Sequence, residues 1–162
     1  MNWFKGLEKL TTYSSYLVMI VMTFYTFFDA IFRYFFNSPL KGAVELTEEV
    51  YMPLFVYFAL SMVYNTGGFV RVTFLIERFS KKIQRIIMIL CDVMALVYVA
   101  FLFTGAWRKF MYSLQIRELS SSELAYPMSP IFGVMVFGLL MLMVRIIQAI
   151  IQGHPKDVLG GE

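Results

Sequence analysis

The chain of 162 residues has very few of the residues that carry enzyme chemistry, since it contains one histidine and one cysteine. The histidine, His154, stands near the C-terminal end, which excludes a haem held by paired histidines within the membrane spans proposed below. The single Cys91 can form neither an internal disulfide nor a multi-thiolate metal site, and we interpret it as a small apolar packing residue. The sequence also has no phosphate-binding Walker loop and no serine nucleophile with a histidine in reach. We therefore expect no enzyme activity, no cofactor and no metal site.

Charged residues are also scarce, at 15% of the chain, whereas 59% of the residues are hydrophobic. Four runs with almost no charge cover residues 10–28, 50–70, 86–107 and 124–144. Each approaches or exceeds the roughly 20 helical residues that cross a bilayer core. The first run is too long for a signal peptide and is not followed by a small-residue cleavage site. The sequence predicts an all-α integral membrane protein, a single membrane domain over 1–162 with spans at about 10–36, 43–67, 83–110 and 127–151.

The lysines and arginines are unequally divided between the two sides that four spans define. Nine lie on the side of both termini: Lys5, Lys9, Arg71, Arg78, Lys81, Lys82, Arg85, Arg145 and Lys156. Five lie on the other side: Arg33, Lys41, Arg108, Lys109 and Arg117. Because basic loops stay in the cytoplasm, we expect both termini to be cytoplasmic. The net charge of +3 is a topology signal, and we expect no nucleic-acid partner.

Charged residues gather between the first two apolar runs, in the segment 29–49. Asp29 and Arg33 are four residues apart and share one helical face, and charges at such a depth are costly unless they pair or face protein. Pro53 lacks the amide that would bond the carbonyl of Glu49, so we expect a kink there. The glutamates of the next helix could simply complement its dipole. The alternative is contact with a partner protein, because Glu45, Glu48, Glu49 and Met52 follow three-and-four spacing on one helical face. The candidate contact residues are Asp29, Arg33, Asn37, Glu45, Glu48 and Glu49.

The segment that follows the second span is amphipathic. Its apolar residues share one face, and its basic residues supply the rest: Arg71, Arg78, Lys81, Lys82 and Arg85. This pattern predicts a short helix over 71–82 in the cytoplasmic interface, in contact with membrane lipids. A simple basic loop is the alternative.

One acid, Asp92, lies within the third span, seven residues beyond Arg85 and so ~10 Å deep at ~1.5 Å per helical residue. An acid at that depth is a candidate ligand for a proton or a sodium ion. A coupled ion site normally needs several oxygen ligands and broken helices, and this helix has neither. We favour a buried or snorkelling hydrogen bond from Asp92 to another helix.

Five local patterns, spread over most of the chain, resemble those of one known family. They are the run RYFFNSPL at 33–40, the acidic pair Glu48 and Glu49, the glycine and arginine of 68–72, Gly105, and the sequence Tyr126-Pro127-Met128. Together they resemble the small membrane subunit, the DctQ-like protein, of tripartite ATP-independent periplasmic (TRAP) transporters.

This resemblance implies a multi-pass protein of the bacterial inner membrane with cytoplasmic termini. It also implies two partners, a large multi-span subunit that moves substrate by an elevator motion and a periplasmic substrate-binding protein. Sodium would bind the large subunit and not this chain. The small subunit would be a scaffold in sodium-driven symport of an organic acid, with sialic acid favoured over a C4-dicarboxylate.

Two other functions remain open from the residues alone. A self-sufficient four-helix proton-coupled exporter would use Asp92 as its titrating group. A four-helix membrane enzyme that uses glutathione would need a cytoplasmic anion site, which the basic stretch 78–85 could supply.

Overall fold

The computed structural model describes residues 2–38, 40–66, 80–122 and 124–152, and almost all of this part is helical. Its elements in chain order are α1 (Asn2–Phe36), α2 (Ala43–Leu46), the π-helical turn η1 (Thr47–Tyr51), α3 (Met52–Asn65), α5 (Lys81–Ile116) and α6 (Ser129–Gln152). Most of the predicted amphipathic segment 71–82, including Arg71 and Arg78, lies outside the described residues. Lys81 begins α5, so the backbone there already belongs to the helix that contains the third span.

Four stretches of the described chain are long and apolar enough to cross a membrane: Gly6–Phe36, Ala43–Tyr64, Ile86–Ile116 and Ser129–Ile151. The prediction of an all-α membrane protein with four spans is thereby confirmed. The first and third stretches have 31 residues each, or ~46 Å of helix at ~1.5 Å per residue. Because this exceeds a ~30 Å hydrocarbon core, these two helices must tilt or extend into the headgroup layers.

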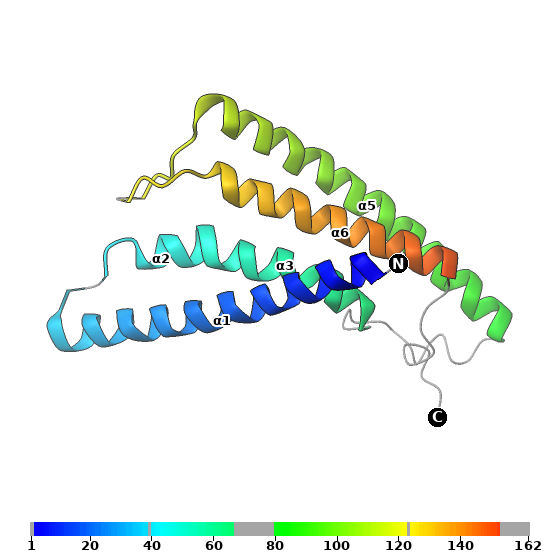
Figure 1. Cartoon of the computed structure of the whole chain (residues 1–162), viewed down its shortest axis with the longest axis horizontal. Helices are drawn as coiled ribbons and strands as arrows, with labels where there is room; N and C mark the ends of the chain where they lie inside the picture. Colours follow the sequence, from blue (N-terminus) through cyan, green and yellow to red (C-terminus); the bar gives the residue numbers. More distant parts are fainter. Residues whose placement is uncertain (1, 39, 67–79, 123, 153–162) are drawn as a thin grey trace.

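The helices form a row and not a closed bundle (Figure 1). Helix α1 packs against α3, α3 packs against α6, and α6 packs against α5. The start of α1 and the end of α6 lie at one end of the row, and the loops after α1 and α5 lie at the other. We call these the terminal end and the loop end. Two helices, α1 and α5, therefore form the edges of the row.

The apolar core lies along α6, where it meets α3 and α5. Tyr64, Val99, Leu139, Leu142 and Ile146 form its buried cluster. Helix α1, by contrast, exposes large apolar side chains along most of its length, as does α5. Since a bilayer solvates apolar side chains, these exposed faces are stable in lipid.

A glycine allows α6 to approach α3 closely near the middle of the row. A Cβ atom added to Gly138 would lie 2.8 Å from the Cβ of Tyr57 and would also collide with the Tyr57 backbone. Only a residue without a side chain fits this crossing. Gly138 thus sets the separation of the two central helices.

The backbone departs from α-helical geometry just before Pro53. The turn η1, Thr47–Tyr51, is π-helical, with wider hydrogen bonding than the α-helical segments on either side. Proline removes a donor and crowds the preceding turn, and a π turn is one way to accommodate it. A kink was expected near Pro53, but a π turn was not. The π turn changes the angular spacing of the residues along the helix, so the three-and-four spacing of Glu45, Glu48 and Glu49 does not define one face there, as it would in a regular α-helix.

The environment of Cys91 differs from the one that the sequence predicted. We interpreted it as a small packing residue, but the structure leaves its side chain exposed on α5. Apolar residues and thiols are equally acceptable on a face directed at lipid, so the sequence pattern could not distinguish the two environments.

Candidate functional site

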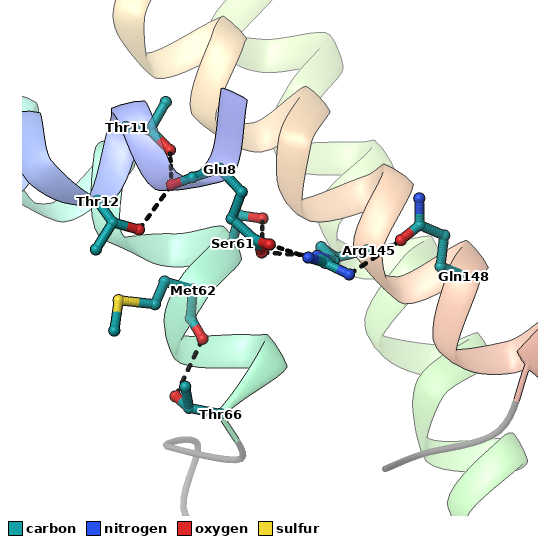
Figure 2. Close-up of polar contacts among 8 residues, drawn as sticks. All are labelled: Glu8, Thr11, Thr12, Ser61, Met62, Thr66, Arg145 and Gln148. Atoms are coloured by element: carbon teal, nitrogen blue, oxygen red, sulfur yellow. Dashed lines mark hydrogen bonds and ion pairs between the residues drawn. The ribbon is translucent and has the colours of Figure 1, made fainter. Parts of the chain in front are cut away.

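A buried ion pair joins the first and last helices at the terminal end of the row. The carboxylate of Glu8 in α1 accepts hydrogen bonds from Nε of Arg145 in α6, at 2.7 Å, and from its Nη2. The hydroxyl of Ser61 in α3 donates to the same carboxylate at 3.0 Å. Figure 2 shows the three side chains converging from three helices. We call Glu8, Ser61, Arg145 and Gln148 the terminal-end cluster.

The terminal-end cluster is well satisfied for a buried charged group. Glu8 is only 8% exposed and Ser61 only 2%. Arg145 contacts both oxygens of Glu8, the paired geometry that planar guanidinium and carboxylate groups favour. Its Nη1 donates to the side-chain oxygen of Gln148 at 3.1 Å. The attraction is strong because the site is shielded from water, and loss of either charge would leave the other buried without its partner.

A second polar contact lies nearby and joins α3 to α5. The hydroxyl of Tyr64 donates to the carboxylate of Asp92 at 2.8 Å. Asp92 is 6% exposed, so it is buried and hydrogen-bonded to another helix, as its isolation in the sequence indicated. With this bond, polar contacts connect all four spans at the terminal end.

Asp29 and Arg33, which the sequence predicts either to pair or to face protein, form an ion pair at the loop end. Nη2 of Arg33 lies 2.9 Å from Oδ2 of Asp29. The other oxygen of Asp29 accepts the backbone N–H of Leu40, also at 2.9 Å. Asp29 therefore fixes the turn after α1, while the Arg33 side chain stays more than half exposed. Asn37 lies in the same turn with a left-handed backbone, φ 49°, and is exposed.

A second cluster at the loop end surrounds Glu49, and we call Glu49, Ser120 and Tyr126 the loop-end cluster. The carboxylate of Glu49 accepts hydrogen bonds from the hydroxyls of Ser120 and, at 2.7 Å, Tyr126. Burial raises the pKa of Tyr126 above its ordinary value because it disfavours the phenolate. The contact joins η1 to the loop between α5 and α6. Glu49 thus has partners within the chain.

The other predicted contact residues are not gathered into one site. Glu45 and Glu48 are exposed, and in the described part of the chain neither side chain forms a hydrogen bond or an ion pair. The structure therefore separates Glu49 from the two acids with which its spacing had grouped it. Lys81, Lys82 and Arg85 lie in the first turns of α5, and their side chains lie outside the described part of the chain.

Sequence reasoning missed the terminal-end cluster. Arg145 entered only the count of lysines and arginines, Glu8 entered only the net charge of the chain, and Ser61 was not considered. The available signal was the position of two opposite charges on the same predicted side, each next to or inside an apolar run. Their separation of 137 residues gave no means of pairing them. In the described part of the chain, no three metal-binding side chains come together.

Comparison with known proteins identifies a family and two similar proteins. Residues 19–155 match the family described as the DctQ component of tripartite ATP-independent periplasmic transporters. Two proteins of Haemophilus influenzae that carry the name TRAP transporter small permease protein are also similar. One is 28% identical over 105 residues, which cover 63% of this chain and 61% of that protein. The other is 27% identical over 146 residues, which cover 86% of this chain and 88% of that protein.

The family match covers most of the chain and includes parts of all four spans. The family is a transporter component and not an enzyme, in agreement with the missing catalytic residues. The four apolar helices and this similarity together support a multi-pass membrane protein. The chain belongs to the DctQ family of TRAP transporter small membrane subunits.

Proposed function

We propose that this chain is the scaffold subunit of a sodium-driven TRAP transporter that imports an organic acid. Its partners would be a large multi-span subunit, which moves the substrate, and a periplasmic binding protein, which delivers it. Sialic acid or a C4-dicarboxylate is the proposed substrate, and sodium would bind the large subunit. The chain would lie in the bacterial inner membrane with both termini in the cytoplasm.

The hydrogen bonds that the buried acids accept within the chain support a scaffold role most directly. Glu8, Asp29 and Asp92 are buried, and each accepts a hydrogen bond from a donor of this chain. Two of these bonds connect different helices and the third fixes a turn. An acid that must bind and release a coupling ion needs an environment that can change, whereas these acids hold helices in place.

The row of helices also suits a scaffold. A row presents broad faces within the membrane, and its edges α1 and α5 expose large apolar side chains. Such a body could enlarge the static part of a larger membrane protein. The exposed polar residues at the loop end, Arg33, Asn37, Glu45 and Glu48, are the proposed contacts with the partners.

The first test is to purify the chain from its native membrane in mild detergent and to identify the proteins that accompany it by mass spectrometry. A stoichiometric, much larger protein with many spans would support the proposal. Recovery of this chain alone or only as a homo-oligomer would contradict it.

The proposed contacts can be tested in the same preparation. A Glu45→Gln and Glu48→Gln double variant is expected to lower the yield of the large partner, while Arg108→Gln, an exposed change in α5 near the same end, serves as the control. Arg33→Ala should likewise reduce assembly or uptake. If the yield of the large partner were equal for wild type, variants and control, these residues would not be part of the interface.

The exporter alternative makes a different prediction. It requires transport by this chain without partners and loss of that transport in Asp92→Asn, which keeps an oxygen to accept the Tyr64 hydroxyl. We expect no transport by the chain alone in vesicles. Proton-coupled transport that disappears in Asp92→Asn would favour the exporter.

A further inference from the structure

A groove at the terminal end of the row combines a positive charge with an apolar wall. Its volume is about 540 Å³, and it lies where α1 and α3 meet, beside the terminal-end cluster. Lys9, Thr12, Tyr13 and Tyr16 of α1 form one side. Met62 of α3 and Thr66, the residue that caps the end of α3, form the other. In Figure 2, Thr12, Met62 and Thr66 lie to one side of the pair of Glu8 and Arg145.

The charges of the groove do not cancel. Glu8 and Arg145 also line it, but they are paired with each other and contribute no net charge. Lys9 is exposed, and no acid in the described part of the chain forms an ion pair with it. The groove therefore carries one positive charge in excess, which attracts an anion.

The two threonine hydroxyls of the groove can accept hydrogen bonds from a ligand. The Thr12 hydroxyl donates to the carbonyl of Glu8 at 2.7 Å, and the Thr66 hydroxyl donates to the carbonyl of Met62 at 3.0 Å. Each hydroxyl has one proton, so only the lone pairs of its oxygen remain for a ligand. A ligand with an anionic group for Lys9 and hydrogen-bond donors for the threonine oxygens would complement this groove.

The surroundings distinguish a lipid from a small soluble anion. The first span begins at Gly6, so the groove lies at the level of the headgroups. Tyr13 is 69% exposed and Tyr16 47%, and Leu10 and Leu17 beside them are each 63% exposed on the same helix. Tyrosine rings favour this interface, and an apolar helix face can carry acyl chains.

We propose that this groove binds the head group of one phospholipid of the leaflet at the terminal end, with its phosphate at Lys9. A head group with hydroxyl donors, such as that of phosphatidylglycerol, satisfies the threonine oxygens. Phosphatidylcholine carries no such donors and has no net charge. The site is separate from the proposed contacts at the loop end, and it does not depend on the transporter assignment.

The test is native mass spectrometry of the purified full-length chain with added phosphatidylglycerol or phosphatidylcholine. We expect one phosphatidylglycerol to be retained preferentially. Lys9→Ala is expected to weaken its binding about fivefold, since a lysine near an anionic surface contributes about 1 kcal/mol. Lys41→Ala, an exposed lysine at the loop end, is the matched control and should change nothing.

Two further measurements control for misfolding of the variants and for binding of a free anion. Unchanged melting temperatures would show that Lys9→Ala and Lys41→Ala remain folded, as expected for exposed side chains. Inorganic phosphate should not displace the lipid. Equal retention of the two lipids, equal effects of the two lysine variants, or displacement by inorganic phosphate would each overturn the proposal.

Discussion

The two ends of the helix row are held together by different chemistry. At the terminal end, Glu8 and Arg145 form a buried ion pair whose partners both stand on long helices. At the loop end, the carboxylate of Glu49 is held by hydroxyls from an irregular loop. A buried ion pair between rigid elements is costly to break, whereas a half-exposed contact to a loop can be replaced by water. We infer that the terminal end is the more rigid.

Removing Arg145 should have the largest effect, because it leaves the carboxylate of Glu8 buried without its ion partner. We expect Arg145→Ala to lower the free energy of unfolding by about 3–5 kcal/mol. Thermal unfolding in detergent measures the change. The Glu8→Ala and Arg145→Ala double variant should be more stable than Arg145→Ala alone, since it has no unpaired charge. A double variant that is no more stable would show that the pair matters only for packing.

A change at the middle of the row should have an intermediate effect. The Cβ added by Gly138→Ala collides with Tyr57, so α3 and α6 must separate. Overpacking of this kind costs about 1–3 kcal/mol. Gly105→Ala is the control, because no atom lies within 4 Å of its added Cβ. We expect a lower melting temperature for the first variant and no loss for the second, and equal behaviour would contradict the close crossing.

The contact at the loop end should contribute less. Glu49→Ala removes the acceptor for Ser120 and Tyr126, and we expect a loss of about 1–2 kcal/mol because water can replace part of the lost interaction. Glu45→Ala, at an exposed acid of α2, is the control and should lie close to wild type. If Glu49→Ala destabilised the chain more than Arg145→Ala did, the ranking of the two ends would be wrong.

The smallest effect should come from Tyr126→Phe, which removes one hydrogen bond worth about 0.5–1.5 kcal/mol. Burial raises the folded-state pKa of Tyr126 above the ordinary value of 10.0. The contribution of the protonated Tyr126 hydroxyl to stability is therefore complete below pH 10.0, and it is lost as the pH rises through the raised pKa. Wild type should therefore lose stability relative to Tyr126→Phe above about pH 10, measured as melting temperature against pH. A difference in melting temperature between the two proteins that stayed constant above about pH 10 would contradict the raised pKa of Tyr126.

The sequence was sufficient to predict the spans but not their arrangement. Runs of about 20 apolar residues identify membrane helices because a bilayer core has a fixed thickness. The order of the helices in the row could not be predicted, since residues that face lipid and residues that face protein are equally apolar. The pairing of Asp29 with Arg33 was predictable because a helix places residues four apart on one face.

The remaining contacts depend on long-range geometry. Glu49 meets Ser120 only because the π turn redirects it and the loop between α5 and α6 returns to η1. Glu8 meets Arg145 only because α1, α3 and α6 are neighbours in that order. Neither the turn nor the order is encoded by local spacing.

A charge exchange tests the central claim, that Glu8 and Arg145 lock the terminal end of the row. Glu8→Arg and Arg145→Glu would be made separately and together, and thermal unfolding in detergent would be compared with wild type. We predict that each single variant, which places two like charges together, is strongly destabilised, and that the double variant recovers a large part of the lost melting temperature. If the melting temperature of the double variant were lowered by the sum of the two single decreases, the claim would be contradicted.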